Sequence, residues 1–332
     1  MEHRIVLIGH GGIAKCYAGI IAGLPHAEVC GVVGRDSARA QAFAAEHGIA
    51  AWGTDVADVA ARARATVAIL CTPNGAHYVG VMEAAAAGLH CLCEKPLAIE
   101  PQQAGAMIAA CRDRGLKLSV SYMRRFTDHV QRLRAAMEAG RLGRITVVDV
   151  VLKHFRSAAY YESWHGTSEM DGGGPFIQQG SHIIDMAVWL CGGYDRVLQA
   201  TCFRTLHDIE TEDHGYAVVS YRNGAIGMIE ASTACVGVSQ ERIEVSGTLG
   251  SVMLDFNGVI SCTVPGLLEE WNVGADPAGG DQLKLMNELV QDFLAAIEQD
   301  REPFVTGESA AAATALISEI YAAAGSIRTR PR

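Results

Sequence analysis

The chain has 332 residues, enough for two domains of ordinary size, and 49% of them are hydrophobic. Its formal charge of −10 at pH 7 argues against nucleic acid or an anionic membrane surface as a partner, because both attract clustered Lys and Arg. The sequence has neither a signal-peptide core nor an apolar run of membrane-spanning length, so we expect a cytoplasmic protein.

Short apolar runs alternate with helical patterns over residues 1–122. The expected strands are Arg4–Ile8, Glu28–Val33, Val67–Cys71, His90–Cys93 and Lys117–Ser121. The helical patterns between them are Ile13–Ala22, Ser37–His47, Ala76–Ala87 and Gln102–Arg114. Such alternation is typical of an α/β fold, so residues 1–122 are predicted to form a domain with a doubly wound parallel sheet.

The pattern changes after Arg125. A helix is expected at Asp128–Ala139, a long strand at Arg144–Phe155 and a helix from about Gln179 to Leu190. Six strand-like runs then follow closely, as an antiparallel meander would: Val197–Arg204, Gly215–Tyr221, Ile226–Thr233, Glu241–Ser246, Ser251–Phe256 and Val259–Thr263. Helices at Gln282–Glu298 and Ser309–Ile327 close the chain.

Residues 123–332 are therefore predicted to form an α+β domain with a large, mainly antiparallel sheet. This half of the chain offers too few helices to cover both faces of such a sheet. We therefore expect a homo-oligomer, either a homodimer or a homotetramer.

The ten cysteines lie mostly in apolar runs and none forms a CxxC pair. Cys91 and Cys93 alternate on one expected strand and share a face, where a metal is conceivable. Buried free thiols in a reducing compartment are the simpler interpretation, so no metal site is predicted.

The first candidate site is the glycine-rich turn after the first expected strand. Gly9, Gly11, Gly12, Ile13 and Ala14 form a GxGxxA motif that opens a helix. Gly9 permits the tight turn, Gly11 lets the backbone approach a pyrophosphate, and the small Ala14 lets helix pack on strand. Because a helix N-terminus attracts phosphate, we predict dinucleotide binding here.

The end of the second strand indicates which dinucleotide binds. A carboxylate there would hold the adenosine ribose diol of NAD, but this chain has Gly34. Arg35 and Ser37 follow, and Arg39 is near. Arg and Ser suit a 2′-phosphate, which favours NADP(H) over NAD(H). The alternative is that Ser37 caps the next helix while Arg35 is solvated.

Two further segments end expected strands, at the edge where open α/β sheets bind ligands. Cys71, Thr72, Pro73 and Asn74 follow the third expected strand, and Glu94, Lys95 and Pro96 follow the fourth. Both segments are predicted to line the cofactor site. His77 is assigned to it as well, although it equally suits a structural role at a helix N-terminus.

The fourth candidate lies after the glycines of Gly172–Gly174. Gln178, His182 and Asp185 follow an i, i+4, i+7 spacing, which places them on one helix face beside aliphatic neighbours. A lone histidine among aliphatic residues is usually structural. The glycine-rich entry and two polar neighbours favour a functional role here.

These segments together resemble the Gfo/Idh/MocA family, named for glucose–fructose oxidoreductase and inositol dehydrogenase. The resemblance rests on Gly9–Ala14, Glu94-Lys95-Pro96 and Gly172–Asp185 in this order, and it extends through Thr72-Pro73-Asn74 and Asp213 to Pro303–Glu308. Residues 160–167 are similar to the family's substrate loop, with His165 where Arg is common after Trp164.

The resemblance implies a Rossmann domain, an open-faced sheet domain and a nicotinamide cofactor. It maps the family's lysine to Lys95 and its catalytic histidine to His182, and puts Gln178 where the family usually has Asp. Unless Glu169, Asp171 or Asp185 replaces that carboxylate, His182 lacks an acidic partner.

The expected reaction moves a hydride between nicotinamide C4 and a hydroxyl-bearing carbon of a sugar, sugar derivative or cyclitol. His182 would exchange the hydroxyl proton, Lys95 would stabilise the alkoxide, and Gln178 would position a hydroxyl. The candidate substrate contacts are Lys153, Arg156, Tyr160, Trp164, His165 and Asp185. The alternatives are a cofactor-sensing regulatory protein without turnover and a glycosidase that uses bound NAD transiently.

Overall fold

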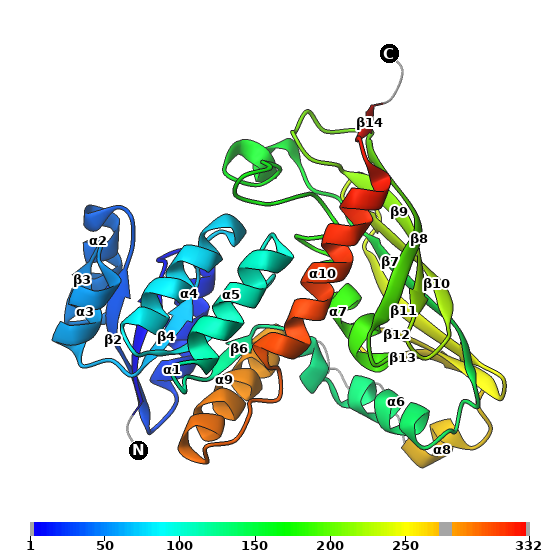
Figure 1. Ribbon diagram of the computed structural model, residues 1–332, viewed down its shortest axis with the longest axis horizontal. Coiled ribbons are helices and arrows are strands. Elements are labelled where there is room, and N and C mark those ends of the chain that lie inside the picture. Colours follow the sequence, from blue (N-terminus) through cyan, green and yellow to red (C-terminus); the bar gives the residue numbers. More distant parts are fainter. Residues whose placement is uncertain (1–2, 272–280, 330–332) are drawn as a thin grey trace. The chain divides into compact units, whose positions relative to one another are not determined.

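The computed structural model describes residues 3–271 and 281–329, and these divide into two compact units (Figure 1). The first unit consists of Met1–Ser121 and Gln282–Ala311, and the second of Tyr122–Asp281 and Ala312–Arg332. The predicted domain ranges also include residues 1–2, 272–280 and 330–332, which lie outside the described residues.

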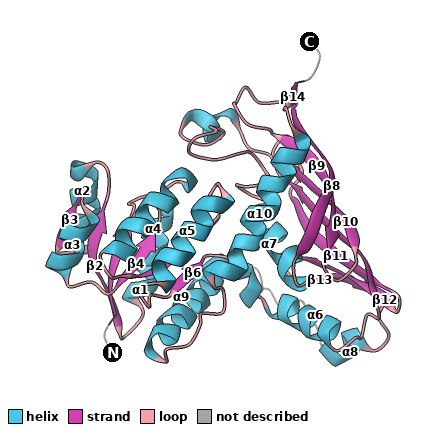
Figure 2. Cartoon of the chain, viewed as in Figure 1, coloured by secondary structure: helices cyan, strands magenta, loops and turns pink. Residues whose placement is uncertain are grey.

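The first unit contains a six-stranded parallel sheet (Figure 2). Its strand order is β3 (Ala51–Gly53), β2 (Ala27–Val33), β1 (His3–Ile8), β4 (Val67–Leu70), β5 (His90–Cys93) and β6 (Leu118–Val120). All four residues of β4 and all three of β6 are buried, as expected for strands covered by helices on both faces. The predicted doubly wound sheet is confirmed.

Six helices cover this sheet. They are α1 (Gly12–Ala22), α2 (Ser37–His47), α3 (Val56–Ala63), α4 (His77–Ala86), α5 (Pro101–Arg112) and α9 (Gln282–Glu298). Helices α3, α4 and α5 pack against one another in turn, and α1 packs against α9. The strand order reverses between β1 and β4, which places the carboxyl ends of these two strands at the ligand-binding edge.

Strand β3 and helix α3 were not predicted. The signal for α3 is present, because Asp55 caps its first turn and its buried residues Val56, Val59, Ala60 and Ala63 follow helical spacing. Strand β3 is only three residues long and pairs with the edge of β2, so its sequence has no periodicity to detect.

The second unit contains an eight-stranded mixed sheet. Its order is β13 (Val259–Cys262), β12 (Gly250–Asp255), β11 (Gln240–Gly247), β7 (Ile145–Lys153), β10 (Ile226–Ser232), β9 (His214–Tyr221), β8 (Tyr194–Arg204) and β14 (Arg328–Thr329). Helices α6 (Asp128–Glu138) and α7 (Ser181–Leu190) pack on it, and α8 (Leu267–Trp271) is short. Most neighbours are antiparallel, as predicted.

The sheet is not a simple meander, however. Strand β7 lies between β11 and β10 and runs parallel to β10, so the chain leaves its sequential order there. The parallel pairing needs β7, a strand more than 70 residues earlier in the chain (Ile226 pairs with Val147), which local turn signals cannot reveal. The sheet is therefore mixed, although mainly antiparallel.

The compact units also differ from the predicted ranges in one segment. Helix α9 and the start of α10 (Gly307–Ala324) belong to the first unit, whereas the sequence placed them in the range 123–332. Helix α9 buries Leu289, Val290 and Phe293 and packs with α1, near the other end of the chain. The amphipathic pattern shows that α9 buries one face but not which helix covers it.

Candidate functional site

The glycine-rich turn between β1 and α1 has the geometry of a phosphate-binding loop. Gly9 has a φ of 112°, and a Cβ on it would lie 2.5 Å from the Cys71 carbonyl oxygen, so only glycine fits. A Cβ on Gly11 or Gly12 would meet nothing within 4 Å. Space is therefore open at the N-terminus of α1, while Ala14 is fully buried against the sheet.

At the end of β2, the His10 ring occupies the space that a side chain at residue 34 would need. A Cβ on Gly34 would collide with the imidazole of His10, which lies over this position. Asp36 is the N-cap of α2, and its Oδ1 accepts from the Arg39 backbone N–H at 3.1 Å. Ser37 is the first helical residue, so the alternative that Ser37 caps the helix is wrong. Arg35 and Ser37 are exposed.

The segment after β4 and the segment after β5 are joined through His77. Its Nδ1 lies 2.7 Å from the Pro96 carbonyl oxygen, and its Nε2 lies 3.0 Å from the Thr72 carbonyl oxygen. The ring is fully buried, and burial lowers its pKa. Both ring nitrogens face backbone carbonyls, so the ring holds the two segments together, which is the structural role that the sequence equally suggested.

Glu94 is also engaged within the protein. Its Oε1 accepts from the Tyr17 hydroxyl at 2.7 Å, and its Oε2 accepts from the Lys95 backbone N–H at 3.2 Å. Burial raises the pKa of Tyr17 well above its ordinary value, so the hydroxyl stays a donor. Glu94 thereby fixes the backbone of Lys95, which is half-buried at the carboxyl end of β5.

The residues of the first unit fit a nicotinamide dinucleotide. Thr72 Oγ1 is buried and has no hydrogen-bond partner in the described parts of the chain, as expected for a donor that serves a ligand. The open space above Gly11 and Gly12 adds a cradle for phosphate. Cys71 and Asn74 are buried beside these groups.

In the second unit, a buried carboxylate supports the glycine segment before α7. Glu212 Oε2 accepts from the Gly174 backbone N–H at 3.0 Å, and its Oε1 accepts from the Tyr321 hydroxyl at 2.8 Å. A Cβ on Gly174 would collide with the Glu212 backbone, and one on Gly173 would collide with the Tyr321 ring. Burial raises the pKa of Glu212 to about 7. Sequence reasoning missed this residue.

Gln178 lies in the turn before α7, which begins at Ser181 rather than near Gln179. Its side-chain nitrogen lies 3.0 Å from His165 Nδ1, and Asp171 Oδ2 lies 3.6 Å from the same ring atom. The structure thus brings two predicted site residues, Gln178 and His165, together.

Aromatic rings surround His165. Its ring stacks on Tyr160 with centroids 4.1 Å apart and planes 10° apart, and Trp164 lies 3.9 Å away. The Gln179 side-chain nitrogen donates to the Tyr160 oxygen at 3.1 Å, and burial raises the pKa of Tyr160. Four of the predicted substrate and acid–base residues, Tyr160, Trp164, His165 and Gln178, are therefore in one cluster.

His182 and Asp185 have different surroundings on α7. The His182 ring meets Tyr122 edge-on, with centroids 6.0 Å apart. Asp185 is buried, and its two oxygens accept from Arg125 at 2.8 and 2.6 Å. Both carboxylate oxygens of Asp185 are thus used within the unit, which favours a structural role for Asp185 over the predicted substrate contact.

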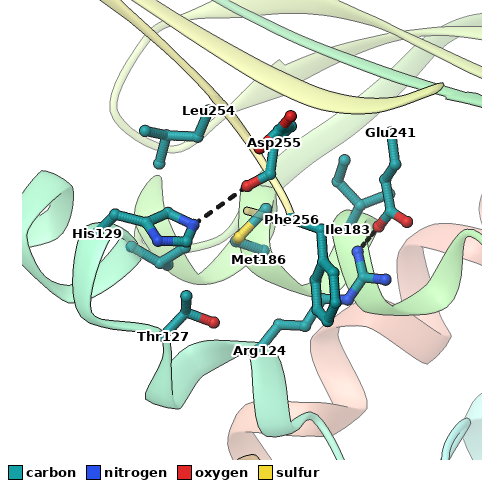
Figure 3. A pocket seen from close by; sticks show the side chains of 10 residues that line it. Arg124, Thr127, His129, Ile183, Met186, Glu241, Leu254, Asp255 and Phe256 are labelled. Carbon is teal, nitrogen blue, oxygen red and sulfur yellow. Dashed lines mark hydrogen bonds and ion pairs between the residues drawn. The ribbon is translucent and has the colours of Figure 1, made fainter. Parts of the chain in front are cut away.

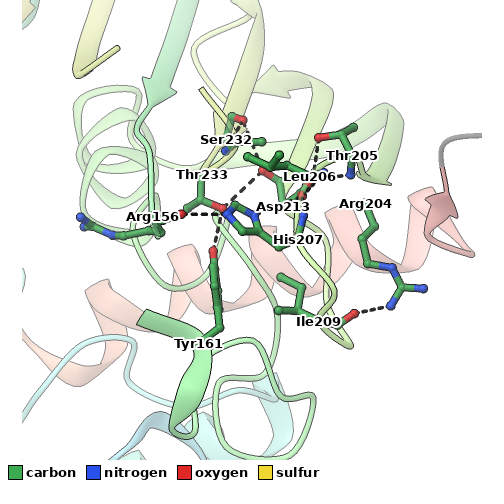
Figure 4. A network of polar contacts seen from close by, with 11 residues as sticks. Arg156, Tyr161, Arg204, Thr205, Leu206, His207, Ile209, Asp213, Ser232 and Thr233 are labelled. Carbon is green, nitrogen blue, oxygen red and sulfur yellow. Dashed lines mark hydrogen bonds and ion pairs between the residues drawn. The ribbon is translucent and has the colours of Figure 1, made fainter. Parts of the chain in front are cut away.

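Two more predicted substrate contacts lie at the end of β7 and just beyond it. Lys153 Nζ is 2.9 Å from Glu230 Oε2. The Arg156 carbonyl oxygen lies 2.8 Å from His207 Nε2, and Asp213 Oδ2 lies 3.2 Å from His207 Nδ1 (Figure 4). Asp213 also accepts from three backbone N–H groups of residues 205–207, which lowers its pKa although burial alone would raise it.

A pocket of the second unit lies between α6, α7 and strands β11 and β12 (Figure 3). Arg124 forms an ion pair with Glu241 there and lies over the Phe256 ring at 4.6 Å. The His129 ring nitrogen Nε2 is 3.1 Å from the Asp255 carbonyl oxygen. None of the predicted site residues lines this pocket.

Neither a group of metal ligands nor a membrane-spanning helix occurs in the described residues. Over residues 3–271 and 281–329, no three or more His, Cys, Asp or Glu side chains are grouped as metal ligands. Within the same ranges, every helix is too short or too polar to cross a membrane.

Lys95 belongs to the first unit and His182 to the second. Tyr17, Arg125 and Glu212 were not predicted, although they position predicted residues. Tyr17 lies on the buried face of α1, where an aromatic residue is normally core. The sequence contains no signal that a partner of Tyr17 lies 77 residues away.

Comparisons with known proteins agree with the fold of the two units. A model described as "Oxidoreductase family, NAD-binding Rossmann fold" matches residues 3–122, and one described as "GFO/IDH/MocA C-terminal domain" matches residues 130–253. Inositol 2-dehydrogenase of Rhizobium meliloti is 26% identical over 328 residues, 95% of each chain. D-glucoside 3-dehydrogenase of Escherichia coli is 28% identical over 249 residues, 70% of each chain.

Among solved structures, the WlbA dehydrogenase from Bordetella pertussis in complex with NADH and UDP-GlcNAcA is similar to this chain. The identity is 28%, the TM-score is 0.89, and the match covers 97% of this chain and 95% of that one.

Proposed function

The chain belongs to the Gfo/Idh/MocA family of oxidoreductases, and from this premise we propose that it oxidises or reduces a hydroxyl-bearing carbon of a sugar, sugar derivative or cyclitol. Relatives named inositol 2-dehydrogenase and D-glucoside 3-dehydrogenase support this substrate class. The observation that carries the proposal is the glycine cradle at Gly9–Gly12 beside the buried, unpartnered hydroxyl of Thr72. A bound nicotinamide dinucleotide would supply the carbon that exchanges the hydride.

The chain's own residues would handle the proton and the charge. His182 takes the hydroxyl proton during oxidation and returns it during reduction, because imidazole changes protonation near neutral pH. Lys95 donates a hydrogen bond to the reacting oxygen and stabilises its negative charge. Gln178 orients a hydroxyl without exchanging a proton, since an amide does not titrate. Glu94 holds the Lys95 backbone for this role.

We propose NADP(H) over NAD(H) as the cofactor. Residue 34 is glycine and carries no carboxylate, the His10 ring occupies the space beside it, and Asp36 is used as a helix cap. Arg35 and Ser37 are exposed, and no carboxylate of the described residues lies within 4.0 Å of Arg35. A free guanidinium and a hydroxyl suit a 2′-phosphate. The cytoplasm is part of the same proposal, because the ten cysteines are free thiols.

Steady-state turnover of sugars, sugar acids and cyclitols with each nicotinamide cofactor tests the function. His182→Ala and Lys95→Met should each lower kcat by about 10²–10⁴, while His182→Ala leaves cofactor affinity unchanged. The exposed His26→Ala is the control and should behave as wild type. Near-normal turnover of a folded His182→Ala variant would overturn the role given to that residue.

The two alternatives give different results in the same assay. Tight cofactor binding without turnover of any compound would indicate a cofactor-sensing protein. Release of an aglycone from a glycoside without net reduction of the cofactor would indicate a glycosidase.

A further inference from the structure

Most cationic side chains around the candidate substrate segment have a carboxylate partner. Lys153 pairs with Glu230, Arg124 with Glu241 and Arg125 with Asp185. Arg156 differs, because no carboxylate of the residues the structure describes lies within 4.0 Å of its guanidinium. Its Nε is buried and likewise has no acceptor there. A partly desolvated cation without a counter-ion is costly unless a ligand supplies the anion.

Arg156 is held in place rather than free to move into solvent. Its carbonyl oxygen is fixed by His207, which lies against the buried Asp213, and its guanidinium lies 5.2 Å above the Tyr160 ring. Figure 4 shows the side chain pointing away from the His207–Asp213 network that holds its backbone. Backbone anchoring and the ring contact pre-orient the guanidinium, so less entropy is lost when an anion binds.

A chain of contacts within the second unit connects Arg156 to the segment that leads into α7. Tyr160, under the guanidinium, stacks on His165, and His165 contacts the Gln178 amide. Gln179 donates to the Tyr160 hydroxyl oxygen. The unpaired cation therefore borders the same cluster that carries the predicted substrate contacts. Asp171 accepts from the Gly166 backbone N–H, and its Oδ2 lies 3.6 Å from His165 Nδ1, so it faces His165 instead of Arg156.

We propose that Arg156 is the residue that recognises an anionic group of the substrate, so that the preferred substrate is an acidic sugar derivative, bearing a carboxylate or a phosphate, rather than a neutral polyol. This inference rests on the proposed function and narrows its substrate class. A guanidinium forms two parallel hydrogen bonds to either anion, which neither Lys nor Gln reproduces.

The test compares matched substrates on the full-length protein with saturating NADP⁺: D-glucose, D-glucuronate and D-glucose 6-phosphate. At least one acid should exceed glucose in kcat/KM by about 10- to 100-fold, and Arg156→Gln should lower the ratio of kcat/KM for that acid to kcat/KM for glucose to about one. Arg156→Lys keeps the charge but not the paired hydrogen bonds, so this variant should retain part of the preference in kcat/KM for the acid. The responding acid identifies carboxylate or phosphate as the anion.

The exposed Arg196 of β8 provides a matched control, because Arg196→Gln removes a cation from the same unit and should keep the preference for the acid. Equal kcat/KM for glucose and both acids in the wild-type protein would overturn the proposal. An equal loss on all three compounds in Arg156→Gln and Arg156→Lys would overturn it as well.

The proposed function and this inference fail separately. If no compound is turned over, the proposed function fails, and thermal stabilisation of the NADPH-bound protein by glucuronate or glucose 6-phosphate then decides the inference. A shift that Arg156→Gln abolishes and Arg196→Gln keeps would support the anion site. No shift from either acid in the wild-type protein would overturn it.

Discussion

Arg35 and Asp36 are neighbours at the end of β2, yet only one of them has a partner within the protein. Asp36 caps α2, while Arg35 is exposed and has no carboxylate within 4.0 Å among the described residues. The same contrast separates Asp185, which is neutralised by Arg125, from Gln178, which contacts His165. A polar side chain is therefore available to a ligand only where its polar atoms are not already bonded to other groups of the protein.

Arg35 should therefore decide the cofactor. Removing a paired hydrogen bond to a 2′-phosphate should weaken NADPH binding by about tenfold or more in Arg35→Ala and leave NADH binding unchanged. Fluorescence titration with both reduced cofactors measures this, and Arg64→Ala, in the same unit, is the control. Tighter binding of NADH by the wild-type protein would contradict the NADP preference.

Gln178 should set the pH dependence of oxidation. A carboxylate at residue 178 would stabilise the protonated form of His182, the proposed general base. A general base must be neutral to accept a proton. Gln178→Asp should therefore move the acidic limb of kcat/KM upward by about one pH unit. Asn has the same length as Asp but no charge, so Gln178→Asn should leave the acidic limb of kcat/KM in place. Coincident limbs in the Asp and Asn variants would show that residue 178 is not coupled to the base.

Helix α7 and the glycine segment before it depend on two buried carboxylates. Asp185 fixes α7 to Arg125, and Glu212 accepts a hydrogen bond from the backbone N–H of Gly174. Both are far along the chain from their side-chain partners, 60 residues for the first pair and 109 for Glu212 and Tyr321. The position of His182 therefore depends on buried polar contacts as well as on apolar packing.

Asp185→Asn should destabilise the protein rather than weaken substrate binding. The change removes the carboxylate that neutralises the buried Arg125, and breaking a buried ion pair in this way costs about 3–5 kcal/mol. Urea unfolding measures the loss. Replacing both residues, in Arg125→Met with Asp185→Leu, should cost less, because no charge stays buried. An unchanged unfolding free energy with a raised KM would instead support the predicted substrate contact of Asp185.

Glu212 should make stability depend on pH. Burial raises its pKa from 4.5 to about 7, so the folded protein binds a proton more tightly than the unfolded chain does. The stabilisation is complete below the unfolded pKa and is lost as the pH rises through the folded one. Relative to Glu212→Gln, the wild-type unfolding free energy should fall by about 2–3 kcal/mol from roughly pH 5 to pH 8.

Gln is a suitable comparison at residue 212, because its oxygen can accept from Gly174 and its nitrogen can donate to Tyr321. Tyr321 and Cys202 are titratable groups close to Glu212. Burial raises the pKa of Tyr321 and, to about 12, that of Cys202. Parallel pH profiles for wild type and Glu212→Gln would refute the assignment.

At the scale of the whole molecule, one face of the eight-stranded sheet presents apolar side chains to solvent. Along β10, Ile226 and Met228 are exposed while Gly227 and Ile229 are buried, so alternate residues point to opposite faces. Val147 of β7 pairs with Ile226 and is exposed too. Contiguous exposed apolar residues of this kind are typical of protein interfaces.

We therefore expect a homodimer or homotetramer that covers this face. Light scattering at micromolar concentration should give at least twice the mass of one chain. A charge at its centre, in Ile226→Lys, should shift the equilibrium towards monomer, because a buried lysine without a partner is costly. Val79→Lys, on an equally exposed apolar residue of the first unit, should not. A monomeric wild-type protein would exclude the oligomer.

Local signals determined much of this protein. Helices α2 and α9 have the predicted bounds, and the GxGxxA turn lies between strand and helix as predicted, because caps, glycine conformations and hydrophobic periodicity act over a few residues. Only the tertiary structure decided that β7 lies between β11 and β10, and that α9 joins the first unit. It also decided that Arg125 neutralises Asp185 and that His165 contacts Gln178. These contacts join residues distant in sequence, and they form because burying apolar surface and satisfying buried polar groups lowers the free energy of the folded unit as a whole, which no local pattern encodes.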